Sequence, residues 1–297
     1  MKDNLETLRK IASRVQRWIG RDDFLIYGGV LSDLLSGNFN QNCDIDIAFK
    51  YESETQIMNV IKALSDNQFC IIADRDYYIR NSHYVRLLYA VKEDVFLDIA
   101  FMNDPHEVGV FTMDSVFYSN QLSELVDNYG GMKDFKEGCI RLREDARTEN
   151  PLYIINRLMC VCAKYNISLK SEEISKIIEE SSWGKVDNIT ENKDALSSFL
   201  SRLIKSIVVA RDQKHFIREL IDEGIVDKAF PILRTVLERT LDNGKYKDAS
   251  SKQEFIMNTY CEANNDLELE ELKKYFSHFR YRSWSEDEFC LAHLCPQ

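Results

Sequence analysis

The amino-acid sequence predicts an α+β protein, in which a head built on a mixed β-sheet is followed by an all-α body. Two observations support this fold class. In the first half, short apolar runs typical of strands alternate with amphipathic helical segments. From about residue 149 onward, one helical pattern follows another, and strand-like runs are few. This change of character predicts two domains, a head over residues 1–147 and a helical body over residues 148–297.

The head is expected to begin with a helix over residues 4–19, whose apolar residues recur at helical spacing until Gly20 ends the pattern. The apolar run over residues 24–27 predicts a buried strand, which Gly28 and Gly29 interrupt. The remaining head elements are predicted as a helix over 30–35, a strand over 44–49, a helix over 53–65, and strands over 69–73, 83–91 and 94–102, the last two joined as a hairpin at Lys92-Glu93.

The body is predicted to consist of successive helices. Their expected ranges are 151–165, 171–181, 193–210, 214–222, 227–240, 251–262 and 267–277. We find no internal repeat and no low-complexity stretch in either half.

The bulk composition is typical of a folded, soluble chain. Of 297 residues, 44% are hydrophobic and 29% are charged. Because no run of about 18 apolar residues occurs, no membrane span is expected. The first twenty residues have mixed charges and no apolar stretch of the kind found in signal peptides, so we expect a cytoplasmic location.

The chain contains eight cysteines, several of them in apolar surroundings. Cys70, Cys160 and Cys162 have apolar neighbours, which predicts reduced and buried thiols. Four residues in the last part of the chain are of the types that bind zinc. The spacings between them match no established zinc pattern, so the sequence does not decide whether they form a zinc site. The residues concerned are Cys261, Cys290, His293 and Cys295.

Three aspartates are the candidate metal ligands. Asp44 and Asp46 are two residues apart in a predicted strand, so both carboxylates are expected on one face. That pattern alone is equally typical of a solvated strand face. Asp98 lies in the apolar strand over residues 94–102, where a lone carboxylate requires a partner. If the two strands are neighbours, the three carboxylates form an oxygen-only site that suits Mg²⁺ or Mn²⁺.

A glycine pair directly precedes these aspartates. Gly28 and Gly29 end the first strand, and a backbone without Cβ atoms allows a ligand to approach closely. The helix that follows offers free N–H groups to phosphate oxygens. A strand, a glycine pair, a helix and then two same-face aspartates together favour a phosphate-containing substrate.

Residues 24–165 resemble a known family. The order Gly-Gly-x-x-x-Asp-x-Leu-x-Gly over residues 28–37, followed by Asp44-x-Asp46, is similar to the head domain of tRNA CCA-adding enzymes and bacterial poly(A) polymerases, in the polymerase-β-like nucleotidyltransferase superfamily. The stretch over residues 125–141 resembles the family segment Asp-Pro-Phe-Gly-Gly-x-x-Asp-Leu-x-x-Gly-x-Ile-Arg. Residues 149–153 take the place of the family's Glu-Asp-x-x-Arg motif.

The resemblance implies a nucleotidyltransferase head that uses Mg²⁺ or Mn²⁺ to transfer a nucleotide from an NTP, with ATP or CTP favoured, to an acceptor hydroxyl. It implies that Asp44, Asp46 and Asp98 are the catalytic, metal-binding residues. The residues that it places against the nucleotide are Gly28, Gly29, Ser32, Asn150 and Tyr153.

The chain departs from the family where arginines hold the nucleotide. Ser32 stands where the family has Arg, and Asn150 and Tyr153 replace the Asp and Arg of the base-selecting motif. Residues 108–112 likewise lack the two arginines of the family's Arg-Arg-Asp-Phe-Thr motif. The arginine fork is difficult to replace in phosphate or base recognition. Arg86, Lys50 and Lys92 are the cations of the head that we consider as substitutes.

Three functions are compatible with these observations. The first is addition of nucleotides to an RNA 3′ end, such as that of a tRNA, and it is favoured by the resemblance. The second is nucleotidylation of a protein or a small molecule, as in toxin or defence systems, and it agrees with the net charge of −11. The third is a non-catalytic binding protein on a decayed scaffold. A basic groove beside the head would favour the first.

Overall fold

The computed structural model describes residues 2–36, 44–79, 83–107, 109–148, 151–180, 193–227 and 229–277. The chain divides into two compact units, Met1–Ala146 and Arg147–Gln297. The division falls within the short 3-10 helix η3 (Glu144–Thr148), beside the boundary expected between residues 147 and 148.

The first unit combines helices with one β-sheet, as the sequence predicts. In chain order its elements are α1 (Lys2–Ile19), β1 (Phe24–Tyr27), α2 (Gly28–Ser36), β2 (Ile45–Lys50), α3 (Glu54–Asp66), β3 (Cys70–Ile79), β4 (His83–Lys92), β5 (Val95–Met102), the 3-10 helices η1 (Pro105–Glu107) and η2 (Met113–Ser115), β6 (Phe117–Ser119), β7 (Glu124–Val126) and α4 (Gly131–Glu137).

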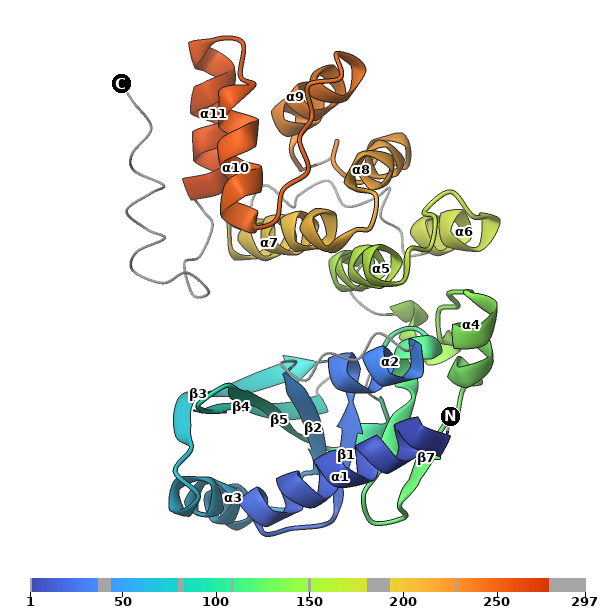
Figure 1. Ribbon diagram of the computed structural model, residues 1–297, viewed down its shortest axis with the longest axis vertical. Helices are drawn as coiled ribbons and strands as arrows, with labels where there is room; N and C mark the ends of the chain where they lie inside the picture. The colour runs from blue at the N-terminus through green and yellow to red at the C-terminus, as the bar shows by residue number, and fades with distance from the viewer. Residues whose placement is uncertain are drawn as a thin grey trace. The chain divides into compact units, whose positions relative to one another are not determined.

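The described strands form one mixed sheet in the order β3-β4-β5-β2-β1-β6-β7 (Figure 1). β2 and β5 run parallel, and the other neighbouring pairs are antiparallel. The expected β4–β5 hairpin is confirmed, with Lys92 opposite Val95 around a two-residue turn. Glu93 in that turn has a φ of 52°, in the left-handed region that tight hairpins require. The α+β fold class is therefore confirmed.

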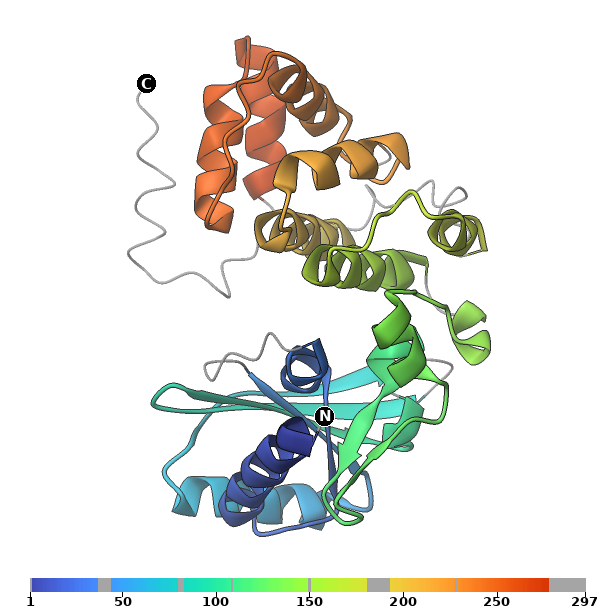
Figure 2. The same ribbon diagram turned by 45° about the vertical axis from the view of Figure 1, so that its right-hand side comes forward.

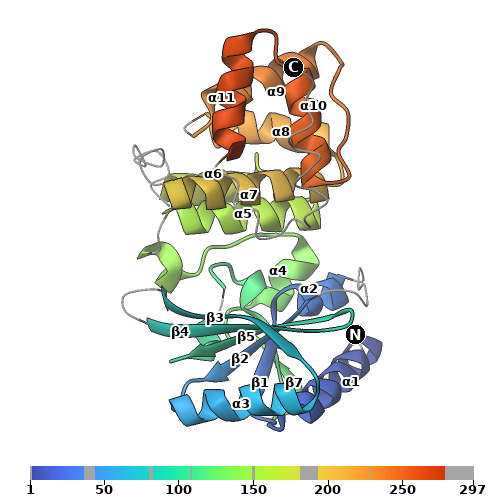
Figure 3. The ribbon, with the colours of Figure 1, turned by 90° about the vertical axis from the view of Figure 1, so that its left-hand side faces the viewer.

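One face of the sheet carries the main hydrophobic core. Helices α1 and α3 lie side by side against it (Figure 3). The apolar stripe of α1, which includes Leu8, Ala12 and Val15, packs with Ile47 and Phe49 of β2. Each of these five side chains is fully buried. The helical spacing on α1 and the alternation on β2 thus meet in one core, as amphipathic elements require.

Some boundaries differ from the sequence prediction. Helix α2 begins at Gly28 and not at Val30, because the carboxylate of Asp46 accepts a hydrogen bond from the Gly29 N–H and caps the first turn. Strand β2 begins at Ile45, one residue later than expected. Strand β3 continues to Ile79 instead of ending near residue 73, and the short strands β6 and β7 were not predicted.

The second unit is helical throughout its described part, as predicted (Figure 2). Its helices are α5 (Pro151–Tyr165), α6 (Glu172–Glu180), α7 (Lys193–Val209), α8 (Gln213–Asp222), α9 (Pro231–Asp242), α10 (Lys252–Cys261) and α11 (Asp266–Ser277). Helix α9 starts four residues later than expected, because Pro231 occupies its first turn, where a missing N–H has no cost. Helices α5 and α7 pack along each other.

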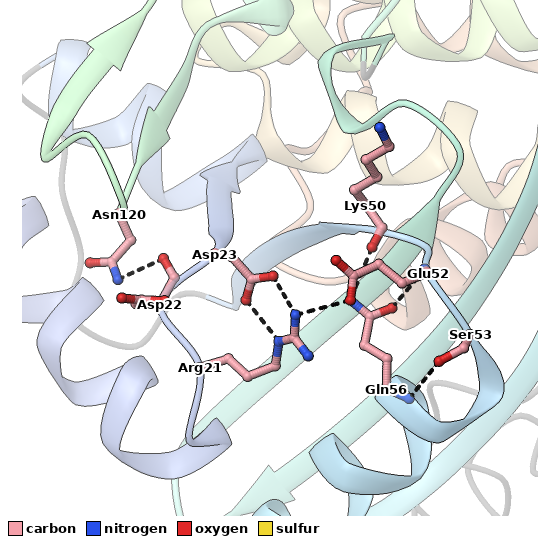
Figure 4. A network of polar contacts seen from close by, with 8 residues as sticks. All are labelled: Arg21, Asp22, Asp23, Lys50, Glu52, Ser53, Gln56 and Asn120. Atoms are coloured by element: carbon pink, nitrogen blue, oxygen red, sulfur yellow. Dashed lines mark hydrogen bonds and ion pairs between the residues drawn. The ribbon is translucent and has the colours of Figure 1, made fainter.

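At the end of the sheet where β1 begins and β2 ends, a polar network joins the loops (Figure 4). The Arg21 guanidinium donates to Asp23, with Nε to Oδ1 at 2.7 Å, and also reaches Glu52 at 3.3 Å. The buried Gln56 amide donates to the Lys50 carbonyl oxygen and accepts from the Glu52 N–H, both at 3.0 Å. These bonds satisfy backbone groups that leave the sheet ladder, so we assign the network a structural role.

Acid should destabilise this network. The hydrogen bond from Arg21 holds the pKa of the Asp23 carboxyl below its ordinary value. The unfolded chain therefore binds more protons in acid than the native protein does, and the contribution of Asp23 is lost as the pH falls through that lowered pKa. We expect the urea midpoint to fall between about pH 5 and pH 3, and to fall less steeply in Asp23→Asn. Parallel slopes in the two proteins would show that Asp23 has no part in it.

No helix in the described part of the chain is long and apolar enough to cross a membrane. Among the described cysteines, all thiols are free, but they are not uniformly buried. Cys162 is buried, and burial raises its pKa. Cys160 is half-buried, whereas Cys70 is exposed. The prediction that Cys70 is buried is therefore wrong, because the residue opens β3, which is the edge strand of the sheet.

Candidate active site

Two of the predicted aspartates lie opposite each other on the central parallel strands. Asp46 of β2 and Asp98 of β5 are register partners, and both are half-buried. Register partners point to the same face and lie about 4.8 Å apart between strands. One oxygen of Asp98 is shielded from solvent. The structure therefore brings these two carboxylates together, as the sequence predicts for neighbouring strands.

Tyrosines flank this pair along the same row of the sheet. Tyr27 of β1 is the register partner of Asp46, and Tyr89 of β4 is the register partner of Asp98. Because side chains alternate along a strand, this row faces away from the core that contains Ile47. The site thus occupies the sheet face opposite α1 and α3. The two tyrosines were not predicted, because no local pattern in the sequence distinguishes them.

The glycine pair lies directly against Asp46. The Gly29 N–H donates to Asp46 Oδ2 at 2.9 Å, which fixes the orientation of that carboxylate. Gly28 has a φ of 68°, and a Cβ atom added there would lie 2.0 Å from the same oxygen. Only glycine fits this position, for both reasons. The positive end of α2 also favours a negative group here.

Asp44 is not brought into the pair. It precedes the first residue of β2 and is exposed, so the same-face rule for residues two apart in a strand does not place it. Among the described residues, no three His, Cys, Asp or Glu side chains form a group that could hold a metal ion as they stand. The expectation of a three-carboxylate group is therefore met only by Asp46 and Asp98.

The predicted nucleotide-binding residues are divided between the two units. Ser32 follows the glycines by one helical turn, and its hydroxyl donates to the Gly28 carbonyl oxygen at 2.5 Å, which braces the turn. Tyr153 is an exposed residue of α5 in the second unit. Asn150 lies outside the described residues, as do Cys290, His293 and Cys295; Cys261, the remaining candidate zinc ligand, is exposed.

The three cations considered as phosphate ligands differ in their contacts within the protein. Arg86 donates to both oxygens of Asp74, at 2.8 and 2.9 Å, and to Glu54 at 2.5 Å. Arg86 in turn holds the pKa of Asp74 below its ordinary value. Lys92 donates to the Asn67 carbonyl oxygen at 2.9 Å. Lys50 is exposed, four residues along β2 from Asp46. Arg86 and Lys92 therefore have a structural role, because their side chains bind groups of the protein itself.

Hydrogen bonds fix the conformation of the segment over residues 125–141, and several of its motif residues take part in them. Asp127 caps α4 by accepting from the N–H groups of Gly131 and Met132, at 2.7 and 2.9 Å. A Cβ atom on Gly131 would meet the Thr112 carbonyl oxygen at 2.1 Å, so this glycine allows α4 to pack against η2. Asp134, which is buried, accepts from the Thr112 hydroxyl.

Two arginines complete this segment. Arg141 donates to the buried Asp134. Arg143, which the sequence analysis did not single out, is fully buried and donates to the Gly109 carbonyl oxygen at 3.1 Å and the Tyr129 hydroxyl at 2.8 Å. Its guanidinium also lies over the Tyr129 ring at 3.9 Å. These contacts stabilise the packing of α4 against η2, and both guanidinium groups are engaged by acceptors within the protein.

The oxygen donors at the Asp46–Asp98 pair are of the type that Mg²⁺ and Mn²⁺ prefer. Like charges at this separation are unfavourable without a cation between them, and the backbone bond from Gly29 keeps Asp46 oriented. The residues present therefore fit a divalent cation. A comparison of the chain with models of known protein families finds no match, and neither does a comparison with curated proteins.

Proposed function

We propose that the first unit is the head of a metal-dependent nucleotidyltransferase. The observation that carries this proposal is the register pairing of Asp46 with Asp98 beside the Gly28–Gly29 start of α2. A carboxylate pair on a central sheet would by itself suit many metal sites. A carboxylate pair that touches a glycine-rich helix start combines cation binding with phosphate binding, which is the combination required for nucleotides.

In this proposal Asp46 and Asp98 hold the cation, and Asp44 is available two residues before Asp46. Bound Mg²⁺ would supply charge neutralisation for the triphosphate and activation of the acceptor hydroxyl. Gly28 has no Cβ atom, so Asp46 can lie directly against the first turn of α2. The Gly29 N–H keeps Asp46 in place while charge shifts during transfer.

The reaction balances as a substitution at phosphorus. The acceptor oxygen forms a bond to the α-phosphorus, the bond from that phosphorus to the bridging oxygen breaks, and pyrophosphate leaves. The hydroxyl proton passes to a base or to solvent. Catalysis of this kind depends mainly on positioning and on charge neutralisation, both of which fixed carboxylates can supply.

The test is a transfer assay that does not presuppose the acceptor. Purified full-length protein is incubated with Mg²⁺ or Mn²⁺, each α-labelled NTP in turn, total cellular RNA and total cellular protein. Label is expected in RNA, at 3′ ends, and should be lost in Asp46→Asn. Asp94→Asn, which changes an exposed aspartate in the β4–β5 turn, is the matched control. Label in protein would select the second acceptor class, and no label with any nucleotide would overturn the proposal.

A further inference from the structure

The solvent face of α1 carries a concentration of positive charge. Its members are Arg9, Lys10, Arg14 and Arg17, which we call the α1 basic face. All four are exposed, and together with Glu6 and Ser13 they line a shallow groove along the helix. At 1.5 Å per residue, the face extends for about 12 Å from Arg9 to Arg17.

This charge contrasts with the rest of the protein. Residues 6–17 have a net charge of +3, whereas the whole chain has a net charge of −11. Among the described residues, the ion pair on this face joins Lys10 to Glu6 at 2.9 Å. Lys10, and to a lesser extent the charge of Arg9, hold the pKa of Glu6 below its ordinary value. Arg14 lies over the Trp18 ring, and Arg17 donates to the Ser13 carbonyl oxygen.

The composition of α1 distinguishes between polyanionic partners. A helix that binds a membrane surface inserts apolar side chains between the lipids. The apolar side chains of α1 are instead buried in the core of the first unit, as shown by Leu8, Ile11, Val15 and Ile19. Only charged and polar groups remain on the exposed face. Contacts of this type are those that proteins make with nucleic-acid phosphates.

We propose that the α1 basic face binds the phosphate backbone of a single-stranded RNA. This inference assigns an acceptor class to the transferase and rests on that proposed function for its purpose. The face is built on the side of the sheet opposite to Asp46 and Asp98. It therefore holds a part of the RNA remote from the reacting 3′ end, and it contributes affinity for long acceptors without changing chemistry at the carboxylates.

The experiment measures RNA binding alone, without NTP or metal, so its outcome is independent of catalysis. Full-length protein is titrated against a fluorescein-labelled, mixed-sequence RNA of about 30 nucleotides, across a range of salt concentrations. Arg9→Gln/Arg14→Gln/Arg17→Gln is expected to weaken binding about tenfold or more at low salt, and to reduce the slope of log K against log salt by about 2. Circular dichroism confirms that the variant is folded.

A matched control separates this face from net charge. Lys62→Gln/Lys133→Gln/Lys136→Gln removes three exposed cations from α3 and α4, and it should bind RNA like the wild type. Glu6→Gln, which removes the acid from the face, should tighten binding. The inference is overturned if the wild-type protein does not bind the RNA, if both triple variants weaken equally, or if vesicles with anionic lipids bind the α1 face more tightly than RNA does.

Discussion

Replacing Asp98 with Asn is expected to lower the rate of nucleotidyl transfer by about 10³-fold or more while the fold is retained. The substitution keeps the size of the side chain but removes one charge from the Asp46–Asp98 pair. An amide is a weak ligand for Mg²⁺ compared with a carboxylate, so the cation would be held poorly. The measurement is a single-turnover rate at saturating NTP, together with circular dichroism.

Thermal unfolding provides a readout that does not depend on activity. A cation that binds the native protein raises the melting temperature, so Mg²⁺ should stabilise the wild-type protein and stabilise Asp98→Asn much less. Asp94→Asn, in the turn that precedes the same strand, should behave like the wild type in both measurements. Full transfer by Asp98→Asn, with the usual response to Mg²⁺, would place the metal elsewhere.

The sequence predicted the centre of this site because two independent patterns agreed there. Asp98 interrupts an otherwise apolar strand, and Asp46 lies between the half-buried Ile45 and the buried Ile47. In the structure these strands are parallel neighbours with the two aspartates in register. The register follows from burial, since a shift of one residue would turn Ile47 and Ile99 out of the core. The spacing of apolar residues also predicted the order of helix, strand and glycine pair that precedes Asp46.

The sequence did not predict the features that depend on where an element begins or on contacts between distant residues. Asp44 satisfies a spacing rule but precedes β2, so the rule for residues two apart in a strand does not determine where it lies. Arg86 was a candidate phosphate ligand by charge, whereas it is held by Asp74 and Glu54. The burial of Arg143 was not predicted, because nothing local in the sequence distinguishes a buried arginine from an exposed one.

The distribution of charge bears on the choice between acceptors. A net charge of −11 argues against extended nucleic-acid binding when it is treated as a property of the whole chain. The position of each charge changes that conclusion, since four cations of α1 share one exposed face. Under the RNA-binding proposal, a basic face on a chain of net negative charge would orient the bound RNA. This charge pattern is the reason why we propose an RNA acceptor and not a protein acceptor.

Gly28→Ala is expected to have the second largest effect, since it disturbs the site and the fold together. The new Cβ would lie 2.0 Å from Asp46 Oδ2, and the φ of 68° is strained for alanine. We expect a loss of about 2–5 kcal/mol in the free energy of unfolding, together with loss of transfer activity. The measurement is urea unfolding at neutral pH, with transfer assayed in parallel.

A matched glycine separates the two causes of this loss. Gly138 has a similar φ of 66°, but nothing lies within 4 Å of an added Cβ, so Gly138→Ala should lose only about 1–2 kcal/mol. An Asp46→Ala background removes the crowding oxygen and leaves only the Asp46 Cβ, at 3.1 Å from the new atom, so Gly28→Ala should then lose little more than Gly138→Ala does. That coupling, measured as a double-mutant cycle, tests the contact itself. Additive losses would mean that Gly28 does not lie against Asp46. The proposal would then lose the contact between Asp46 and the start of α2 on which it depends.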